Sequence, residues 1–129
     1  MSTAPIERER AYPLADALLT TTILDLIHAA SDNRQVRLGA NQANQALNRG
    51  MAELIVMAAD ATPLEVVLHL PIICEEKNVG YVFVPSKEAI GKAVNSNRKI
   101  IAVAITSNDA SLLNKRIQEL KGKIEEIII

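Results

Sequence analysis

An uninterrupted apolar run over residues 54–59 (Leu-Ile-Val-Met-Ala-Ala) constrains the fold of this chain more than any other feature. Such a run has the length of a strand, is too short for a helix, and is typical of a strand that is covered on both faces. Similar runs over residues 81–84 and 100–105 predict two further strands, and a shorter extended piece is expected over residues 35–38. The chain therefore needs helices on both faces of a sheet.

Segments with the apolar spacing of amphipathic helices separate the predicted strands. The last of these segments carries an inward stripe that includes Leu112, Leu113 and Ile117. Strands and helices thus alternate along 129 residues, a length that suits one domain. We expect a flexible arm over residues 1–12 and, over residues 13–129, a single α/β/α sandwich with a four-stranded mixed sheet. The predicted helices cover residues 13–31, 39–48, 62–77, 86–93 and 109–129.

Two of the predicted helices have clear boundary signals. Thr62 is expected to be the N-cap of the third helix, Pro63 its first residue, and Glu65 the acidic partner that completes a capping box. The second helix is expected to open at Gly39 and to end before Gly50, because glycine commonly follows the last turn of a helix.

Composition and residue spacing argue against catalysis. The single cysteine, Cys74, excludes a disulfide framework and a cysteine-rich zinc site, and neither His28 nor His69 stands at a metal-ligand spacing from it. The glycines are isolated, so no phosphate-cradling loop is predicted, and Asp60 has no evident acid-base partner. No apolar run approaches about 18 residues, the length of a membrane span. We therefore expect no enzyme activity, no cofactor, no metal and no membrane partner.

The charge is unevenly distributed along the chain. The net charge of −1 argues against a protein that coats nucleic acid by bulk electrostatics, and three aromatic side chains are too few for a base-stacking sheet. Two basic segments nevertheless flank an acidic one, and they form one basic face if the fold brings them together. Otherwise they are ordinary solvated charges. The basic residues are Arg34, Arg37 and Arg49 in the first segment and Lys87, Lys92, Arg98 and Lys99 in the second.

The predicted helix over residues 39–48 is rich in amide side chains. An open helix start presents backbone N–H groups to phosphate, and amide side chains offer a donor and an acceptor together to base edges. The alternative is an ordinary polar outer face of a helix. The positions expected to face outward are Asn41, Gln42, Asn44, Gln45 and Asn48.

Several blocks of this sequence resemble a known family. The stretch Arg37-Leu-Gly-Ala-Asn-Gln42 with Leu47-Asn-Arg-Gly50 resembles the kink-turn RNA-binding signature of the L7Ae ribosomal protein family. Further blocks, among them residues 55–61, 74–79 and 81–84, extend the resemblance over about residues 11–129. The resemblance implies an α/β/α sandwich, in agreement with the elements predicted above.

The resemblance also implies a binding mode at the second helix. In that family the Gly-Asn helix start enters the kinked RNA and contacts tandem sheared G·A pairs. By position, Gly39 and Asn41, which follow Arg37 in the signature, match the residues that make the backbone and base contacts. Gln42 stands where the family usually carries Glu, and Leu38 and Gln45 stand where Lys is common. These departures reduce the expected electrostatic affinity without changing the mode.

A nucleotide pocket is the second implication of the resemblance. In the family a bulged nucleotide flips into a pocket between two loops. The matching positions here are Val66, Lys87, Arg98 and Ile101, and Thr62 stands where close relatives carry Glu.

Partners and location follow from the resemblance as expectations. It implies binding to kink-turns of U4 small nuclear RNA and box C/D small nucleolar RNAs, and nucleation of particles that act in pre-mRNA splicing and rRNA processing. Proteins with a Nop domain are the implied protein partners, and the nucleus and nucleolus the implied location. Outside the particle the chain is expected to be a monomer. The alternatives are an H/ACA or ribosomal paralogue of the same fold, or a protein-interaction scaffold that has lost RNA binding.

Overall fold

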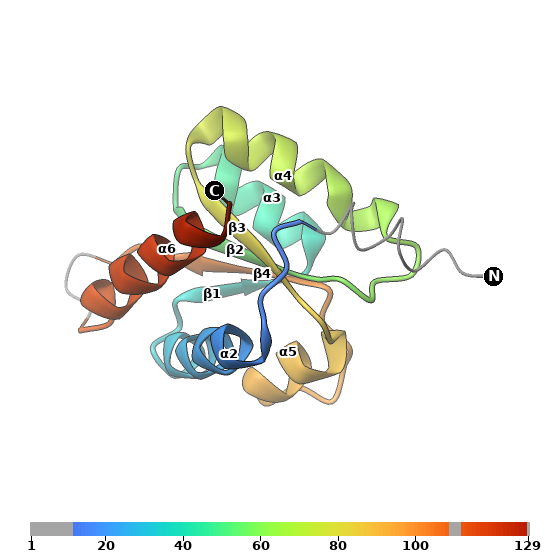
Figure 1. The fold of residues 1–129 in the computed structure, drawn as a ribbon, viewed down its shortest axis with the longest axis horizontal. Coiled ribbons are helices and arrows are strands. Elements are labelled where there is room, and N and C mark those ends of the chain that lie inside the picture. Colours follow the sequence, from blue (N-terminus) through green and yellow to red (C-terminus); the bar gives the residue numbers. More distant parts are fainter. Residues whose placement is uncertain (1–11, 109–111, 129) are drawn as a thin grey trace.

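The computed structural model describes residues 12–108 and 112–128. The predicted flexible arm therefore lies, apart from Tyr12, outside the described residues. Helices and strands alternate in the predicted order (Figure 1). The helices are α2 (Ala17–Asp32), α3 (Ala40–Asn48), α4 (Glu65–Lys77), α5 (Lys87–Ala93) and α6 (Asn114–Ile128), and the strands are β1 (Val36–Leu38), β2 (Ala52–Ala58), β3 (Gly80–Val84) and β4 (Ala102–Thr106).

The four strands form one mixed sheet in the order β1-β4-β2-β3, as predicted. Strands β2 and β3 are parallel, whereas β4 runs antiparallel to both β1 and β2. Alternate residues of β2 face opposite sides: Leu54 and Val56 pack with α2, α5 and α6, while Ile55 and Met57 pack with α3 and α4. Both faces of the sheet are therefore covered, which explains the continuous apolar run of the sequence (Figure 1).

The first helix begins later than predicted. Asp16 caps α2 by accepting a hydrogen bond from the backbone N–H of Leu19 at 2.8 Å. The residues before it lie extended beside β3: Phe83 N–H donates to the carbonyl of Pro13 and Ala15 N–H donates to the carbonyl of Phe83. Pairing with the edge of the sheet therefore replaces the first turn that the apolar spacing predicted.

The capping box predicted at the start of α4 is wrong. The helix begins at Glu65, and the Thr62 hydroxyl donates to the carbonyl of Asp60 at 3.4 Å instead of accepting from the helix. The backbone N–H groups of Val66 and Val67 are bonded to carbonyls three residues back. Burial of Leu64 in the core holds the chain in this tightened turn, so no side-chain cap is needed.

The start of the last helix also differs from the prediction. Helix α6 begins at Asn114, and Leu112, which was expected to face inward, is 94% exposed. Leu112 precedes the helix and so is not on its apolar stripe. Leu113 and Ile117 are buried as predicted, and Leu120 and Ile124 continue the buried stripe. The predicted helix start at Asp109 lies outside the described residues.

Candidate functional site

Four chain segments meet at one edge of the sheet. Because β4 is antiparallel to its neighbours, its first residues lie beside the last residues of β1 and β2. Hydrogen bonds join the segments: Gly39 N–H to the carbonyl of Ala102 at 2.7 Å, Ala58 N–H to that of Ile101 at 2.9 Å, and Ala59 N–H to that of Val84 at 2.8 Å. We call this region, residues 38–42, 58–64, 84–87 and 98–102, the site edge.

Helix α3 opens at the site edge without a side-chain cap. Gly39 is its N-cap with φ of 93°, and a Cβ at this position would meet open space, so glycine is required for its backbone conformation rather than for room. The N–H groups of Ala40, Asn41 and Gln42 have no hydrogen-bond partner in the described part of the chain, and the first turn carries no acid. This helix start is able to accept an anionic group.

An open hollow of about 480 Å³ lies beside the start of α3. One wall is formed by residues 38–42, and the other by Lys99, Ile100 and Ile101 of the segment that leads into β4. Asn41 and Gln42 are exposed, and Leu38 is 37% exposed. The hollow therefore combines apolar side chains, amide groups and one cation, which suits the face and edge of a nucleobase together with a phosphate.

The two basic segments meet only in part. Lys99 lies opposite the start of α3, while Arg37 and Arg49 line a second, smaller recess with Gln45. Gln42 lines both the hollow and this recess. The Arg37 guanidinium donates to the carbonyl of Val36 at 3.1 Å. Arg34 precedes β1 and so lies toward the opposite end of that strand. Charge is therefore distributed around α3 rather than on it.

Asn44 does not face outward as predicted. It is half-buried, and its Oδ1 atom is buried with no hydrogen-bond partner among the described residues. Asn44 lies one turn after Ala40 and one turn before Leu47, on the face that packs against the core. The spacing of Asn44 from Ala40 and Leu47 indicated the inner face of the helix, but the polar side chain suggested an outward position.

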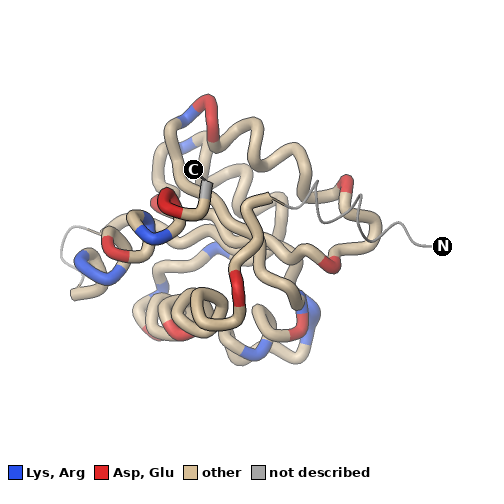
Figure 2. Tube along the Cα trace, in the orientation of Figure 1, with Lys and Arg blue, Asp and Glu red and all other residues tan. Residues whose placement is uncertain are grey.

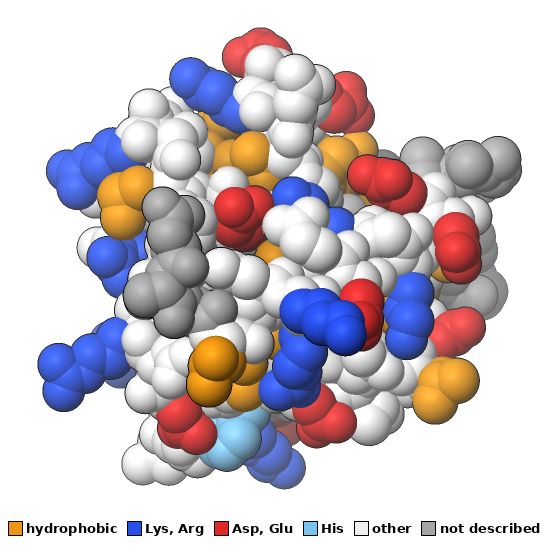
Figure 3. All heavy atoms as spheres, turned by 90° about the vertical axis from the view of Figure 1, so that its left-hand side faces the viewer, with side chains coloured by type: hydrophobic (Ala, Val, Ile, Leu, Met, Phe, Trp, Pro, Cys, Tyr) orange, Lys and Arg blue, Asp and Glu red, His pale blue; other side chains and the backbone are white. Residues whose placement is uncertain are grey.

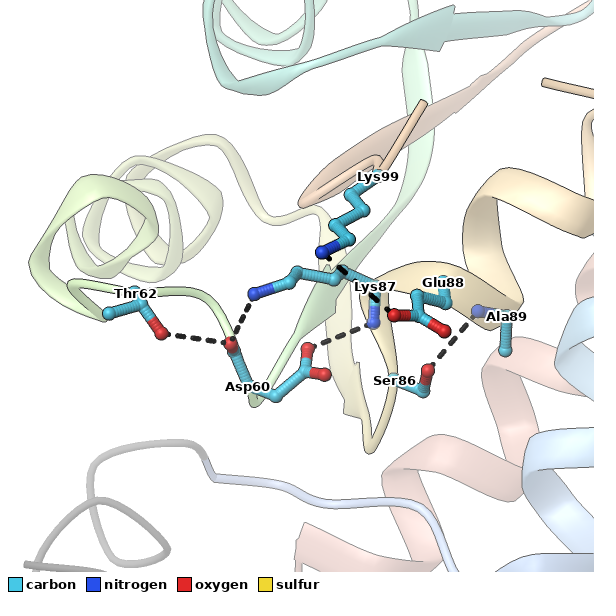
Figure 4. A network of polar contacts seen from close by, with 7 residues as sticks. All are labelled: Asp60, Thr62, Ser86, Lys87, Glu88, Ala89 and Lys99. Atoms are coloured by element: carbon cyan, nitrogen blue, oxygen red, sulfur yellow. Dashed lines mark hydrogen bonds and ion pairs between the residues drawn. The ribbon is translucent and has the colours of Figure 1, made fainter. Parts of the chain in front are cut away.

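Asp60 ties two loops of the site edge together (Figure 4). Its carboxylate accepts a hydrogen bond from the backbone N–H of Lys87 at 2.8 Å, and its backbone carbonyl accepts from Lys87 Nζ at 3.2 Å. Ser86, the first residue of the helix predicted over residues 86–93, caps α5 by accepting from the backbone N–H of Ala89 at 3.2 Å. Asp60 thus positions Lys87 and Thr62, a role that its position after β2 did not reveal.

The residues expected to form the nucleotide pocket lie in loops and first helical turns in or next to the site edge. Thr62 and Lys87 are joined through Asp60, and Ile101 is half-buried beside Ala58. Val66 stands in the first turn of α4 and is 41% exposed, and Arg98 is exposed in the loop before β4. Lys87 follows β3 and Arg98 precedes β4, and the end of β3 and the start of β4 lie at the same edge of the sheet.

Two groups with shifted pKa values lie toward the other end of the sheet. Burial raises the pKa of the Cys74 thiol to about 12, with a smaller contribution from the charge of Glu75. Burial, and a hydrogen bond that its hydroxyl donates to Glu75 at 2.9 Å, raise the pKa of Tyr81 to about 12.

In the described part of the chain, no helix is long and apolar enough to cross a membrane.

Comparisons with known proteins agree with this fold. Residues 21–113 match the ribosomal protein L7Ae/L30e/S12e/Gadd45 family. NHP2-like protein 1 of Xenopus tropicalis is 54% identical over 127 residues, covering 98% of this chain and 99% of that protein. A 13 kDa ribonucleoprotein-associated protein of Yarrowia lipolytica is 53% identical over 120 residues, covering 93% and 95%. The structure of the Giardia lamblia 15.5kD RNA binding protein superposes with a TM-score of 0.88 at 42% identity, covering 92% of this chain and 97% of that one. The chain therefore belongs to the ribosomal protein L7Ae/L30e/S12e/Gadd45 family.

Proposed function

We propose that this chain is a non-catalytic RNA-binding protein that recognises kink-turns through the site edge. The observation that carries the proposal is the uncapped start of α3, with Gly39 at positive φ, beside the open hollow. The names of similar proteins, a ribonucleoprotein-associated protein and an RNA binding protein, support the same class of ligand.

Recognition is expected to combine backbone and side-chain groups of α3. The free N–H groups of residues 40–42 bind a phosphate or a base carbonyl, and Gly39 has no side chain to keep the RNA away. The exposed amides of Asn41 and Gln42 each donate and accept, so they bind base edges in the splayed part of a kinked RNA. Since α3 itself carries no charged side chain, these hydrogen bonds provide specificity with little bulk electrostatic attraction.

A gel-shift titration tests this proposal. Affinity is measured at matched salt for a kink-turn RNA and for a simple stem of the same length. Tight binding to the kink-turn with a clear preference over the stem is expected. Equal binding to both RNAs, or none, would refute the proposal and favour the alternative of an interaction scaffold, for which the absence of charge on α3 is the supporting observation.

The flipped nucleotide is proposed to lie against Val66 and Ile101, with Lys87, Arg98 and Thr62 at its polar edges. Val66→Asp should weaken binding to a kink-turn with the bulged nucleotide much more than to one that lacks it. The variant is expected to fold because Val66 is exposed and an acid suits the first turn of a helix. Ile72→Asp is the matched control, since Ile72 is 62% exposed further along the same helix. An equal loss for both RNAs would mean that Val66 forms no pocket.

The biological setting is proposed on the resemblance. We infer that the chain is the counterpart of the 15.5 kDa protein of the spliceosomal tri-snRNP and box C/D snoRNPs. In that role it binds U4 small nuclear RNA and box C/D small nucleolar RNAs in the nucleus and nucleolus, and Nop-domain proteins bind the resulting protein–RNA surface. Sequencing the RNAs crosslinked to the tagged protein tests this assignment against an H/ACA or ribosomal role.

A further inference from the structure

A second hollow, of about 250 Å³, lies between α5 and the loop that leads from α5 to β4. Every side chain that lines it is polar, and three of the six are cations against one acid. Two of them, Arg98 and Lys99, also belong to the site edge, and because Lys99 lines both hollows the two adjoin. The lining residues are Glu88, Lys92, Ser96, Asn97, Arg98 and Lys99.

The loop that forms this hollow is held firmly against α5. Ser96 N–H donates to the carbonyl of Gly91 at 2.8 Å, and Arg98 N–H donates to the Ser96 hydroxyl at 3.0 Å. A Cβ on Gly91 would collide with the carbonyl oxygen of Arg98, so glycine is what allows the loop to approach the helix. The backbone of this loop is thus ordered before a ligand binds, and only its exposed side chains remain to be ordered on binding.

The charges around the hollow are available to a ligand. Lys92 makes no ion pair in the described part of the chain. Lys99 Nζ lies 4.0 Å from a Glu88 carboxylate oxygen, but both side chains are nearly two-thirds exposed, and such a pair contributes little and exchanges readily with another anion (Figure 4). By contrast, Lys87 is engaged with Asp60 inside the site edge.

The recess between α2 and α6 differs from this hollow in its lining. Along the trace of α6 positive and negative residues alternate (Figure 2), and the surface at the α6 end intermingles both signs with scattered apolar side chains (Figure 3). The recess between α2 and α6 contains Leu26 and Leu120 as well as charges of both signs. The recess with Arg37 and Arg49 also carries cations without an acid, but Ala46 and Met51 line it as well, whereas every side chain that lines the α5–β4 hollow is polar.

We propose that the hollow between α5 and the α5–β4 loop is a phosphate-binding site for the backbone of the same RNA, with Lys92 and Lys99 as its main cations. The inference rests on the proposed function, because it assigns to the bound RNA a second contact region beyond α3. Lys99 stands where the two hollows adjoin, so a strand that leaves the start of α3 reaches the cations by passing over it. The uncharged α3 would then supply base recognition, and the α5–β4 loop the backbone contacts.

The salt dependence of kink-turn binding tests this division. Lys92→Gln and Lys99→Gln are each compared with Lys115→Gln, an exposed lysine of α6 whose loss changes the net charge equally. Each hollow variant should reduce the slope of log K against log salt by about 0.7–0.9, and should weaken binding about 6-fold near 0.1 M salt. The control should keep the wild-type slope, and melting temperatures should agree among the three variants.

A charge change of the opposite sign provides an independent arm. Glu88→Gln removes the acid of the hollow and should tighten binding and steepen the slope. Wild-type slopes in both lysine variants, with the kink-turn preference intact, would overturn the phosphate site and leave the proposed function standing. Loss of the kink-turn preference in the wild-type protein would instead overturn the proposed function, and this inference with it.

Discussion

Replacing Gly91 by alanine tests the close contact between α5 and the following loop, the two segments that form the cationic hollow. Gly91 lies inside α5 and is buried. Its carbonyl accepts from Ser96, and its Cα faces the backbone of Arg98. An added Cβ would lie well inside van der Waals contact with the Arg98 carbonyl oxygen, and because that atom belongs to the backbone, the loop has to move.

Two opposing effects determine the change in the free energy of unfolding. Alanine is favoured over glycine inside a helix by about 1 kcal/mol. Overpacking costs about 1–3 kcal/mol, and displacing the loop weakens the hydrogen bond from Ser96, which is worth about 1 kcal/mol. We therefore expect Gly91→Ala to destabilise the protein by about 1–2 kcal/mol, a fall in Tm of roughly 4–8 °C for a chain of this size.

Gly122→Ala is the matched control because the same substitution then meets no neighbour. Gly122 lies inside α6, is exposed, and a Cβ there has no atom within 4 Å. The free energy of unfolding of this variant should rise by about 1 kcal/mol, because alanine has the higher helix propensity and the unfolded chain has less conformational freedom. Urea and thermal unfolding followed by circular dichroism measure both variants. A Gly91→Ala protein as stable as the wild type or more so would refute the contact argument, as would equal shifts for the two glycines.

Three further predictions concern the site edge and the core. Asn41→Ala should cost about 1–3 kcal/mol in kink-turn affinity and leave Tm unchanged, because the side chain is exposed; Asn48→Ala is the control. Unchanged affinity with a lower Tm would mean that Asn41 has a structural role instead. Gln45→Lys should steepen the slope of log K against log salt by about 1, the effect of one added phosphate contact. It should also lower Tm slightly, because the new ammonium group lies in the recess with Arg37 and Arg49 and is repelled by them. An unchanged slope would mean that this part of α3 does not approach the RNA backbone. Burial raises the pKa of Cys74 from 9.0 to about 12, so the folded state keeps a proton that the unfolded state loses. The stability provided by Cys74 should therefore be complete below pH 9 and decline as the pH rises toward 12, and in unfolding experiments across this range Cys74→Ala should reduce that decline.

The order of the elements was predictable because its signals are local in the chain. The apolar run of residues 54–59 became most of β2, and the helix predicted over residues 86–93 is α5 with Ser86 as its N-cap. Gly39 and Gly50 adopt positive φ values of 93° and 69° at the two ends of α3, where glycine was expected. Each of these features depends on residues within about one helical turn, so the sequence alone was sufficient.

Local signals failed where a tertiary contact outweighed them. The capping pattern at Thr62 was correct in spacing, but burial of Leu64 and the nearby carbonyl of Asp60 determined where α4 begins. Asn44 was expected outside because it is polar, yet packing of α3 on the core left its Oδ1 atom buried. The cost of one unpaired acceptor is small beside the burial of a whole helix face, so packing prevailed.

The residues of the candidate site were evident in the sequence, but their arrangement was not. Composition and the family resemblance indicated Gly39, Asn41 and the basic residues before β4, whereas strand pairing decided that Leu38 and Lys99 line one hollow. That pairing requires β4 to lie antiparallel between β1 and β2, in a register that buries both of its faces at once. A slip of one residue would turn every side chain of β4 to the wrong face. The sequence by itself thus determined the local elements and the chemical groups, and the tertiary structure decided which groups meet, because contacts between distant segments form only when the whole core is packed.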